Sequence, residues 1–217
     1  EPKIKNKSWP RTSIDRHVLA GLETKGLQPV ADADKRTLIR RVYYDLTGLP
    51  PSPDNVSEFL SDNSTKALEK VVDRLLASSH FGERWGRHWL DVVRYAESNG
   101  MERNAAFPHA WRYRDYVIDS FNADKPFDEF IKEQVAGDLL PGKTTDARRI
   151  ATGFLAMGPK SLNNSNKAEF IMDTVDEQLD VTTRAFMGLT VACARCHDHK
   201  FDPIPTEDYY SMAGIFK

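Results

Sequence analysis

Cysteine is almost absent from this sequence: Cys193 and Cys196 are the only two among 217 residues. Two cysteines this close together cannot form a disulfide framework, which excludes the class of small domains that disulfides stabilise. Stability must therefore come from a hydrophobic core and from any cofactor that the chain binds. Long apolar runs are also missing, because no stretch approaches the roughly 20 residues that a membrane-spanning helix needs.

An excess of charge of either sign is missing as well. Lysine and arginine together number 30, aspartate and glutamate 32, and the formal net charge is -2. This balance argues against a nucleic-acid partner. Hydrophobic residues make up 40% and charged residues 29%, which is ordinary for a globular domain. The length suits one large domain or two small ones, and we expect a single domain over residues 1–217.

Both cysteines lie in one motif, Cys193-Ala194-Arg195-Cys196-His197. C-x-x-C-H is the attachment signature of c-type haem. Two thiols at this spacing can each form a thioether to one haem vinyl group, and the histidine that follows can donate an imidazole nitrogen to the iron. We therefore expect one covalent haem c, held by Cys193 and Cys196, with His197 as the proximal iron ligand.

Three other interpretations of this motif remain open. A thioredoxin-like redox pair would need a βαβ context with the cysteines at the start of a helix. A zinc site could use Cys193, Cys196, His197 and His199, although four ligands within seven residues are closer than the usual separated pairs. The third interpretation is a pair of buried structural thiols beside an unrelated histidine.

Apolar residues recur at helical spacing through most of the chain, and breakers fall between the periodic segments. This pattern predicts an all-α fold: a single irregular multi-helix domain with the haem motif at the end of its longest helix. The expected helices cover residues 13–25, 34–46, 52–60, 64–76, 83–96, 110–122, 126–139, 145–155, 167–193 and 206–216.

The distal side of the iron needs a residue from a separate element, and His88 is the first candidate. His88 shares one helix face with Trp85 and Trp89, which could wall a flat apolar cofactor. We therefore expect His197 and His88 as the two iron ligands, with Trp85 and Trp89 beside the haem. The competing interpretation is a buried histidine bonded to the backbone or to a carboxylate such as Asp91.

Other distal arrangements stay open at this point. Met101, Met157 and Met212 are possible ligands, and an open distal position is a further possibility. Met172 and Met187 lie on the predicted long helix and fit a core role. His199 is too close to His197 to reach the opposite face of the same iron.

Arg112 lies in the stretch 111–116, where two arginines alternate with three aromatic residues. Arginine pairs well with carboxylates, and haem carries two propionates. We therefore expect Arg112 at a haem edge or at a partner surface. The alternative is an ordinary ion pair with a neighbouring aspartate such as Asp115.

The sequence resembles the planctomycete-type cytochrome c domain family of the second kind, long catalogued as a domain of unknown function. The resemblance spans nearly the whole chain. Its matching stretches include Asp45-Leu46-Thr47-Gly48-Leu49-Pro50-Pro51, Gly82-Glu83-Arg84-Trp85, His88-Trp89-Leu90-Asp91, Trp111-Arg112-Tyr113-Arg114-Asp115, Ala136-Gly137-Asp138-Leu139-Leu140 and Cys193 through Pro203. The resemblance implies haem c. Because members are usually parts of larger exported proteins, it also implies an extracytoplasmic (periplasmic or exported) location.

We expect electron transfer to a redox partner domain or protein, because covalent haem usually serves that purpose. Two alternatives are a haem enzyme with an open distal site, acting on peroxide or another small oxidisable molecule, and a haem that only staples the helices together. The first residues, Glu1 to Lys5, do not form a signal peptide. We therefore expect this chain to be a mature or excised piece of an exported protein.

Overall fold

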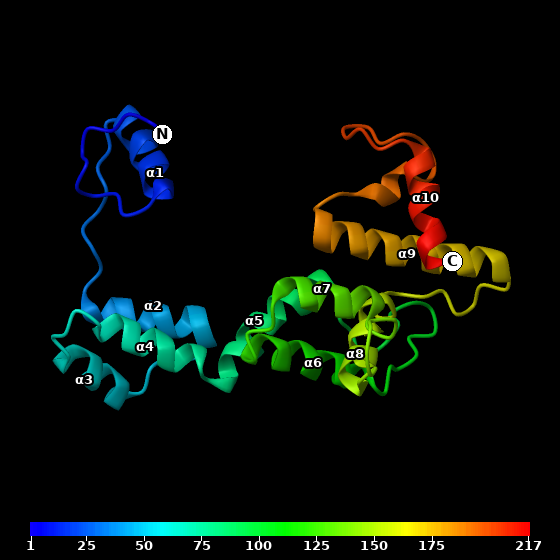
Figure 1. The fold of residues 1–217 in the computed structure, drawn as a ribbon, viewed down its shortest axis with the longest axis horizontal. Coiled ribbons are helices and arrows are strands. Elements are labelled where there is room, and N and C mark those ends of the chain that lie inside the picture. Colours follow the sequence, from blue (N-terminus) through cyan, green and yellow to red (C-terminus); the bar gives the residue numbers. More distant parts are fainter.

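The computed structural model describes residues 1–217 and is helical throughout (Figure 1). Ten α-helices and two short 3-10 helices are present, and one isolated bridge between Ser98 and Ala106 is the only β pairing. The all-α prediction is confirmed. The helices are α1 (Ser13–Thr24), α2 (Lys35–Thr47), α3 (Pro53–Ser61), α4 (Ala67–Leu76), α5 (Ser79–Val92), α6 (Ala110–Asn122), α7 (Phe127–Ala136), α8 (Asp146–Ala151), η1 (Thr152–Leu155), α9 (Lys167–Met187), η2 (Val191–Arg195) and α10 (Thr206–Phe216).

Local capping sets several helix starts where the sequence predicts them. The side chain of Asp34 accepts the backbone N–H of Thr37 at the start of α2, and Ser52 does the same for Asn55 at the start of α3. These bonds satisfy amide groups that have no partner within the helix. Helices α2, α3 and α4 then bury one apolar face each in a shared cluster, which contains Ile39, Tyr43, Phe59, Ala67, Val71 and Leu75.

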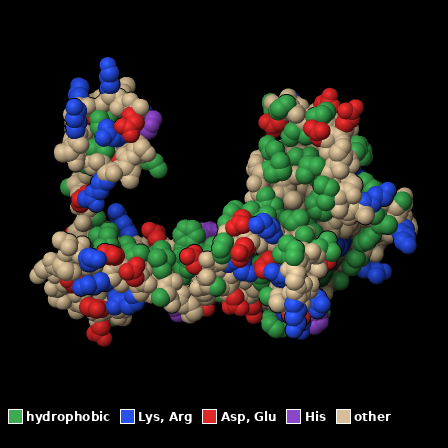
Figure 2. All heavy atoms as spheres, viewed as in Figure 1, with side chains coloured by type: hydrophobic (Ala, Val, Ile, Leu, Met, Phe, Trp, Pro, Cys, Tyr) green, Lys and Arg blue, Asp and Glu red, His purple; other side chains and the backbone are tan.

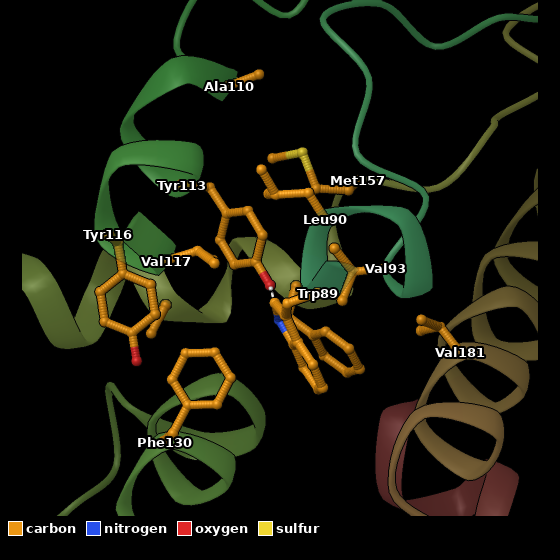
Figure 3. Close-up of a cluster of buried hydrophobic side chains, with 12 residues drawn as sticks. Trp89, Leu90, Val93, Ala110, Tyr113, Tyr116, Val117, Phe130, Met157 and Val181 are labelled. Carbon is orange, nitrogen blue, oxygen red and sulfur yellow. Dashed lines mark hydrogen bonds between the residues drawn. The ribbon is translucent and has the colours of Figure 1, made fainter. Parts of the chain in front are cut away.

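The central part of the chain holds the largest core, between α5, α6, α7 and η1. At its centre the indole N–H of Trp89 donates to Tyr113 Oη at 3.1 Å (Figure 3). The same N–H donates to Gln134 Oε1 at 3.2 Å. The Tyr113 hydroxyl also donates to Gln134 Oε1, so Trp89, Tyr113 and this oxygen are joined in one buried network, while the Gln134 amide nitrogen has no hydrogen-bond partner. Aromatic and aliphatic side chains surround them: Leu90, Val93, Ala110, Tyr116, Val117, Phe130, Ala151, Phe154, Met157 and Val181.

A third cluster joins α9, η2 and α10 at the C-terminal end. Its buried members are Val175, Leu179, Val191, Ala194, Tyr209 and Ala213. Helix α9 lies between this cluster and the central core, since Val181 on the same helix belongs to the central cluster. In Figure 1 helices α2 to α8 form a row; the C-terminal part lies above one end of this row, and α1 lies above the other end, over α2.

The long helix before the haem motif is shorter than the sequence predicts. Helix α9 ends at Met187 because Gly188 adopts a left-handed conformation with φ +65°, and its N–H bonds to the carbonyl of Thr183. This is the usual way in which glycine ends a helix. The prediction of an unbroken helix to Cys193 is therefore wrong. The motif begins on η2, a separate 3-10 helix that ends at Arg195, and Cys196 and His197 lie in the turn that follows. None of the helices has the length and apolar character needed to cross a membrane.

Candidate haem-attachment site

The motif on η2 presents its reactive side chains outward. Both Cys193 and Cys196 are free thiols with exposed side chains, and His197 is exposed as well. The neighbouring Val191 and Ala194 are buried in the C-terminal cluster. The interpretation of the cysteines as buried structural thiols is therefore wrong, because the residues between and before them form the core contacts instead.

Arg195, the second residue between the cysteines, anchors η2 to the long helix. Its Nη2 lies 3.0 Å from Asp173 Oδ1 and its Nη1 lies 3.2 Å from Asp176 Oδ2, both on α9. The hydrogen bond that Arg195 donates to the Asp173 carboxylate raises the pKa of Arg195 above its ordinary value. Tyr209 on α10 donates its hydroxyl to the same Asp176 at 2.6 Å, and Tyr210 donates to the carbonyl of Arg195 at 3.2 Å. The backbone of the motif is thus attached to both flanking helices.

His197 has the hydrogen bond that a metal-ligating histidine needs. Its Nδ1 lies 2.8 Å from the carbonyl oxygen of Asp198, and a carbonyl can only accept, so Nδ1 carries the proton. In a neutral ring the lone pair then belongs to Nε2, which has no hydrogen-bond partner. Metal-ligating histidines commonly donate their other N–H to a backbone carbonyl in this way. Two free exposed thiols and this imidazole together fit the requirements of haem c.

The two remaining interpretations of the motif lack structural support. His199 uses both ring nitrogens, toward Thr190 Oγ1 and toward backbone amides, so it has no lone pair left for a zinc ion. No group of three or more His, Cys, Asp or Glu side chains is arranged to hold a metal ion. A thioredoxin-like pair needs a βαβ unit, and this chain has no strands.

His88 lies on α5, which belongs to the central part of the molecule. Its ring is exposed and packs edge-on against Trp85, with 5.4 Å between ring centroids. Asp91 pairs with Arg87 and not with His88, so the interpretation of a histidine held by that carboxylate is wrong. In Figure 1, α5 lies in the row of helices below α9, and α10 lies above α9.

The two tryptophans around His88 lie in different surroundings. Trp85 is 39% exposed and tilted against Phe81, while Trp89 is buried in the central aromatic core. Trp89 follows His88 directly in the helix, so its side chain points in a different direction, and the Trp89 ring faces the core. Trp85 is thus available at the surface beside His88, and Trp89 holds α5 against the core.

Arg112 lies at the surface of α6, with its guanidinium 5.5 Å from the centre of the Trp111 ring. Both residues line a cavity of about 580 Å³ between α6 and α8, together with Asp119, Lys125 and Asp146. Arg112 makes no ion pair with Asp115, which pairs with Arg114 instead.

The methionines differ in their availability. Met101 is exposed in the loop before α6, Met157 is buried in the central cluster, and Met212 packs against the C-terminal cluster. Met187 is 55% exposed at the end of α9, so the prediction that it belongs to the core is wrong. Met187 and Met212 lie in the same part of the molecule as the haem motif.

Sequence reasoning missed the residues that hold the motif in place. These are Asp173 and Asp176 on α9, Tyr209 and Tyr210 on α10, and Thr190 before η2. The spacing of the two aspartates, three residues apart on one helix face, was a signal that could have indicated a shared partner.

A family model named PSCyt2, described as a protein of unknown function (DUF1549), matches residues 13–217. The match covers all ten α-helices and includes the whole motif. Comparison with curated proteins and with solved structures found no match. The chain therefore belongs to the PSCyt2 family, the planctomycete-type cytochrome c domain family of the second kind that its sequence resembles.

Proposed function

We propose that residues 1–217 are a single mono-haem c-type cytochrome domain that transfers electrons to a partner domain or protein outside the cytoplasm. One observation carries this proposal: within residues 193–197, the side chains that would bind haem are different from the side chains that contact the rest of the protein. The side chains that haem attachment requires are exposed and free of partners, except for the carbonyl that orients His197. Ala194 and Arg195 between the cysteines bind the motif to the rest of the protein.

In this proposal Cys193 and Cys196 hold the haem by thioethers and His197 is the proximal ligand. The bound haem would supply one-electron redox chemistry. This chain's own residues orient and hold it: the Asp198 carbonyl keeps the proton on His197 Nδ1, and the Arg195 ion pairs keep η2 against α9. An electron-transfer role requires a redox partner. If residues 1–217 are one domain of a larger exported protein, another domain of that protein can be this partner.

Exposed hydrophobic side chains in the C-terminal part support a large apolar ligand there. Phe201, four residues after His197, is 82% exposed, and Tyr210, whose hydroxyl contacts the motif backbone, is 54% exposed. Figure 2 shows hydrophobic side chains gathered on the visible face of this part of the molecule. Contiguous exposed apolar surface marks interaction or ligand-binding sites, and a porphyrin needs apolar cover.

For the distal side, His88 remains the first proposal. Its ring is exposed and no side-chain hydrogen bond occupies it, and Trp85 beside it offers an aromatic surface. For His88 to bind the iron, α5 must approach η2, either by movement within the chain or from a second molecule. Met101, Met157 and Met212 are the alternatives within this chain. Arg112, exposed beside Trp111, is proposed to contact a haem propionate or the partner.

Production of the chain with an export signal and a haem-maturation system tests the attachment. The expected intact mass is that of the chain plus one haem. Replacement of both cysteines, Cys193→Ser with Cys196→Ser, should abolish the added mass while the helical circular dichroism signal stays unchanged. Matched single variants should each retain one thioether. Covalent haem in the double variant, or none in the wild-type protein, would contradict the proposal.

The spectrum of the loaded protein tests the distal ligand and separates electron transfer from catalysis. We expect a low-spin ferric spectrum that becomes high-spin in His88→Ala, with the haem still attached. An unchanged spectrum would exclude His88 and direct attention to the methionines. A high-spin wild-type spectrum with peroxide reactivity would favour the enzyme with an open distal site, and a haem that does not change oxidation state would favour the structural role.

A further inference from the structure

His199, two residues beyond the proposed proximal ligand, is held by hydrogen bonds on both ring nitrogens. Only 6% of its side chain is exposed. Nδ1 accepts the backbone N–H groups of Phe201 at 3.2 Å and of Asp202 at 2.9 Å. Asp202 Oδ2 also lies 3.4 Å from Nδ1, but a nitrogen that accepts two N–H groups at shorter distances carries no proton, so we assign the ring proton to Nε2. Nε2–H then donates to Thr190 Oγ1 at 2.9 Å.

These bonds connect the chain before the motif to the chain after it. Thr190 directly precedes η2, and its carbonyl accepts the N–H of Cys193 at 3.0 Å. On the other side, the backbone N–H of His199 donates to the carbonyl of Ile204 at 2.9 Å. One buried imidazole therefore closes a loop whose exposed segment contains Cys193, Cys196 and His197.

Asp198 extends the same arrangement to α10. Its Oδ1 accepts the N–H of Thr206 at 2.9 Å and the Thr206 hydroxyl at 3.3 Å, at the first residue of that helix. The carbonyl of Asp198 is the group that accepts from His197 Nδ1. The carbonyl that orients His197 thus belongs to a short backbone segment, residues 198–199, whose two side chains are both held by hydrogen bonds.

We propose that His199 is a positioning residue: it fixes the loop that presents the two thiols and the Nε2 of His197, and it binds no metal itself. This proposal rests on the proposed function in one respect only: that function identifies haem as the group that Cys193, Cys196 and His197 bind. The physical reason is general, because hydrogen bonds around a ligating histidine set its tautomer and ring orientation. His199 acts here through the Asp198 carbonyl and the loop backbone.

Four variants, one of them a control, separate the two halves of this arrangement. In His199→Asn the Oδ1 can replace Nδ1 as acceptor for the amides two and three residues ahead, as asparagine does in turns. The bond to Thr190 is then lost. Thr190→Ala removes that same bond from the other partner, and Thr190→Ser is the matched control that keeps the hydroxyl. His199→Ala removes both halves.

Nuclear magnetic resonance of the reduced, haem-free 217-residue chain tests the arrangement directly. We expect the Nε2–H tautomer for His199, the Nδ1–H tautomer for His197, and slow exchange of the Phe201 and Asp202 amides. Loss of one hydrogen bond should speed local opening by about two- to tenfold. His199→Asn should keep the slow amides, while His199→Ala should lose them and leave His197 with mixed tautomers. A proton on His199 Nδ1, or an unchanged His197 tautomer in His199→Ala, would overturn the proposal.

The haem-loaded protein provides the second readout. His199→Asn and Thr190→Ala should lower the fraction of chains that carry haem to the same extent and shift the reduction potential in the same direction. The double variant should equal either single variant, and Thr190→Ser should behave as wild type. If the wild-type chain takes up no haem, the proposed function fails, and the tautomers decide the His199 proposal separately. Wild-type attachment and potential in His199→Ala would refute the positioning role.

Discussion

The close contact between α5 and α6 gives a quantitative test of the fold that positions His88 and Trp85. A Cβ atom added at Gly82 would lie 2.4 Å from the carbonyl oxygen of Ile118 and 2.6 Å from the side chain of Asn122. Real Cβ atoms do not approach a backbone oxygen so closely, so Gly82→Ala must push the two helices apart. The same variant weakens the bond in which the Gly82 N–H donates to Asn122 Oδ1 at 2.8 Å.

The expected change in the free energy of unfolding is the sum of two costs and one gain. Overpacking typically costs about 1–3 kcal/mol, and the weakened hydrogen bond costs about 1 kcal/mol. Alanine is favoured over glycine within a helix by about 1 kcal/mol. The sum predicts that Gly82→Ala lowers the free energy of unfolding by about 1–3 kcal/mol.

A matched control lies in α1. A Cβ atom at Gly21 meets nothing within 4 Å, so Gly21→Ala should keep the helix-propensity gain without the clash. Urea unfolding followed by tryptophan fluorescence and circular dichroism measures both variants against wild type. A Gly82→Ala chain as stable as wild type would refute the α5–α6 packing described here.

Two further predictions concern buried polar groups. Trp89→Phe keeps an aromatic ring in the core but removes the donor to Tyr113 and Gln134, so urea unfolding should show a loss of about 1–3 kcal/mol; no loss would contradict this network. Burial is the main cause that raises the pKa of Glu177 above its ordinary value of 4.5, against the opposing effect of Arg94, whose Nη2 lies 2.5 Å away. A raised pKa means that the folded state binds this proton more tightly, so the contribution of Glu177 to stability is largest below pH 4.5 and decreases as the pH rises through its folded pKa. Glu177→Gln should remove this part of the pH dependence, and an identical stability–pH slope in the variant would refute the assignment.

Much of the fold follows from local sequence signals. The start of α2 at Asp34, of α3 at Ser52 and of α8 at Thr145 is fixed by capping side chains, which are visible in the sequence. The end of α9 was missed because apolar periodicity continues past Gly188, whereas the backbone of that glycine takes the left-handed conformation that ends the helix. Periodicity alone does not report a single change of backbone conformation.

The candidate site divides in the same way. Cys193, Cys196 and His197 are adjacent in sequence, so their spacing alone identifies them. The tertiary partners of the motif come from α9 and α10 and depend on how three helices pack, which the sequence does not state. His88 and the motif are distant in sequence, and a shared helix face with Trp85 and Trp89 could not show which of these side chains the core would bury. The Trp89 ring packs against aromatic side chains of the core, and its indole N–H has partners there in Tyr113 and Gln134.

Peptide mapping of the exported, haem-matured protein is the most direct test of the central claim. We expect one proteolytic fragment that contains both Cys193 and Cys196 to carry the entire added mass of one haem, with no free thiol left to react with an alkylating reagent. Two alkylatable thiols in that fragment, with no haem mass, would contradict the account.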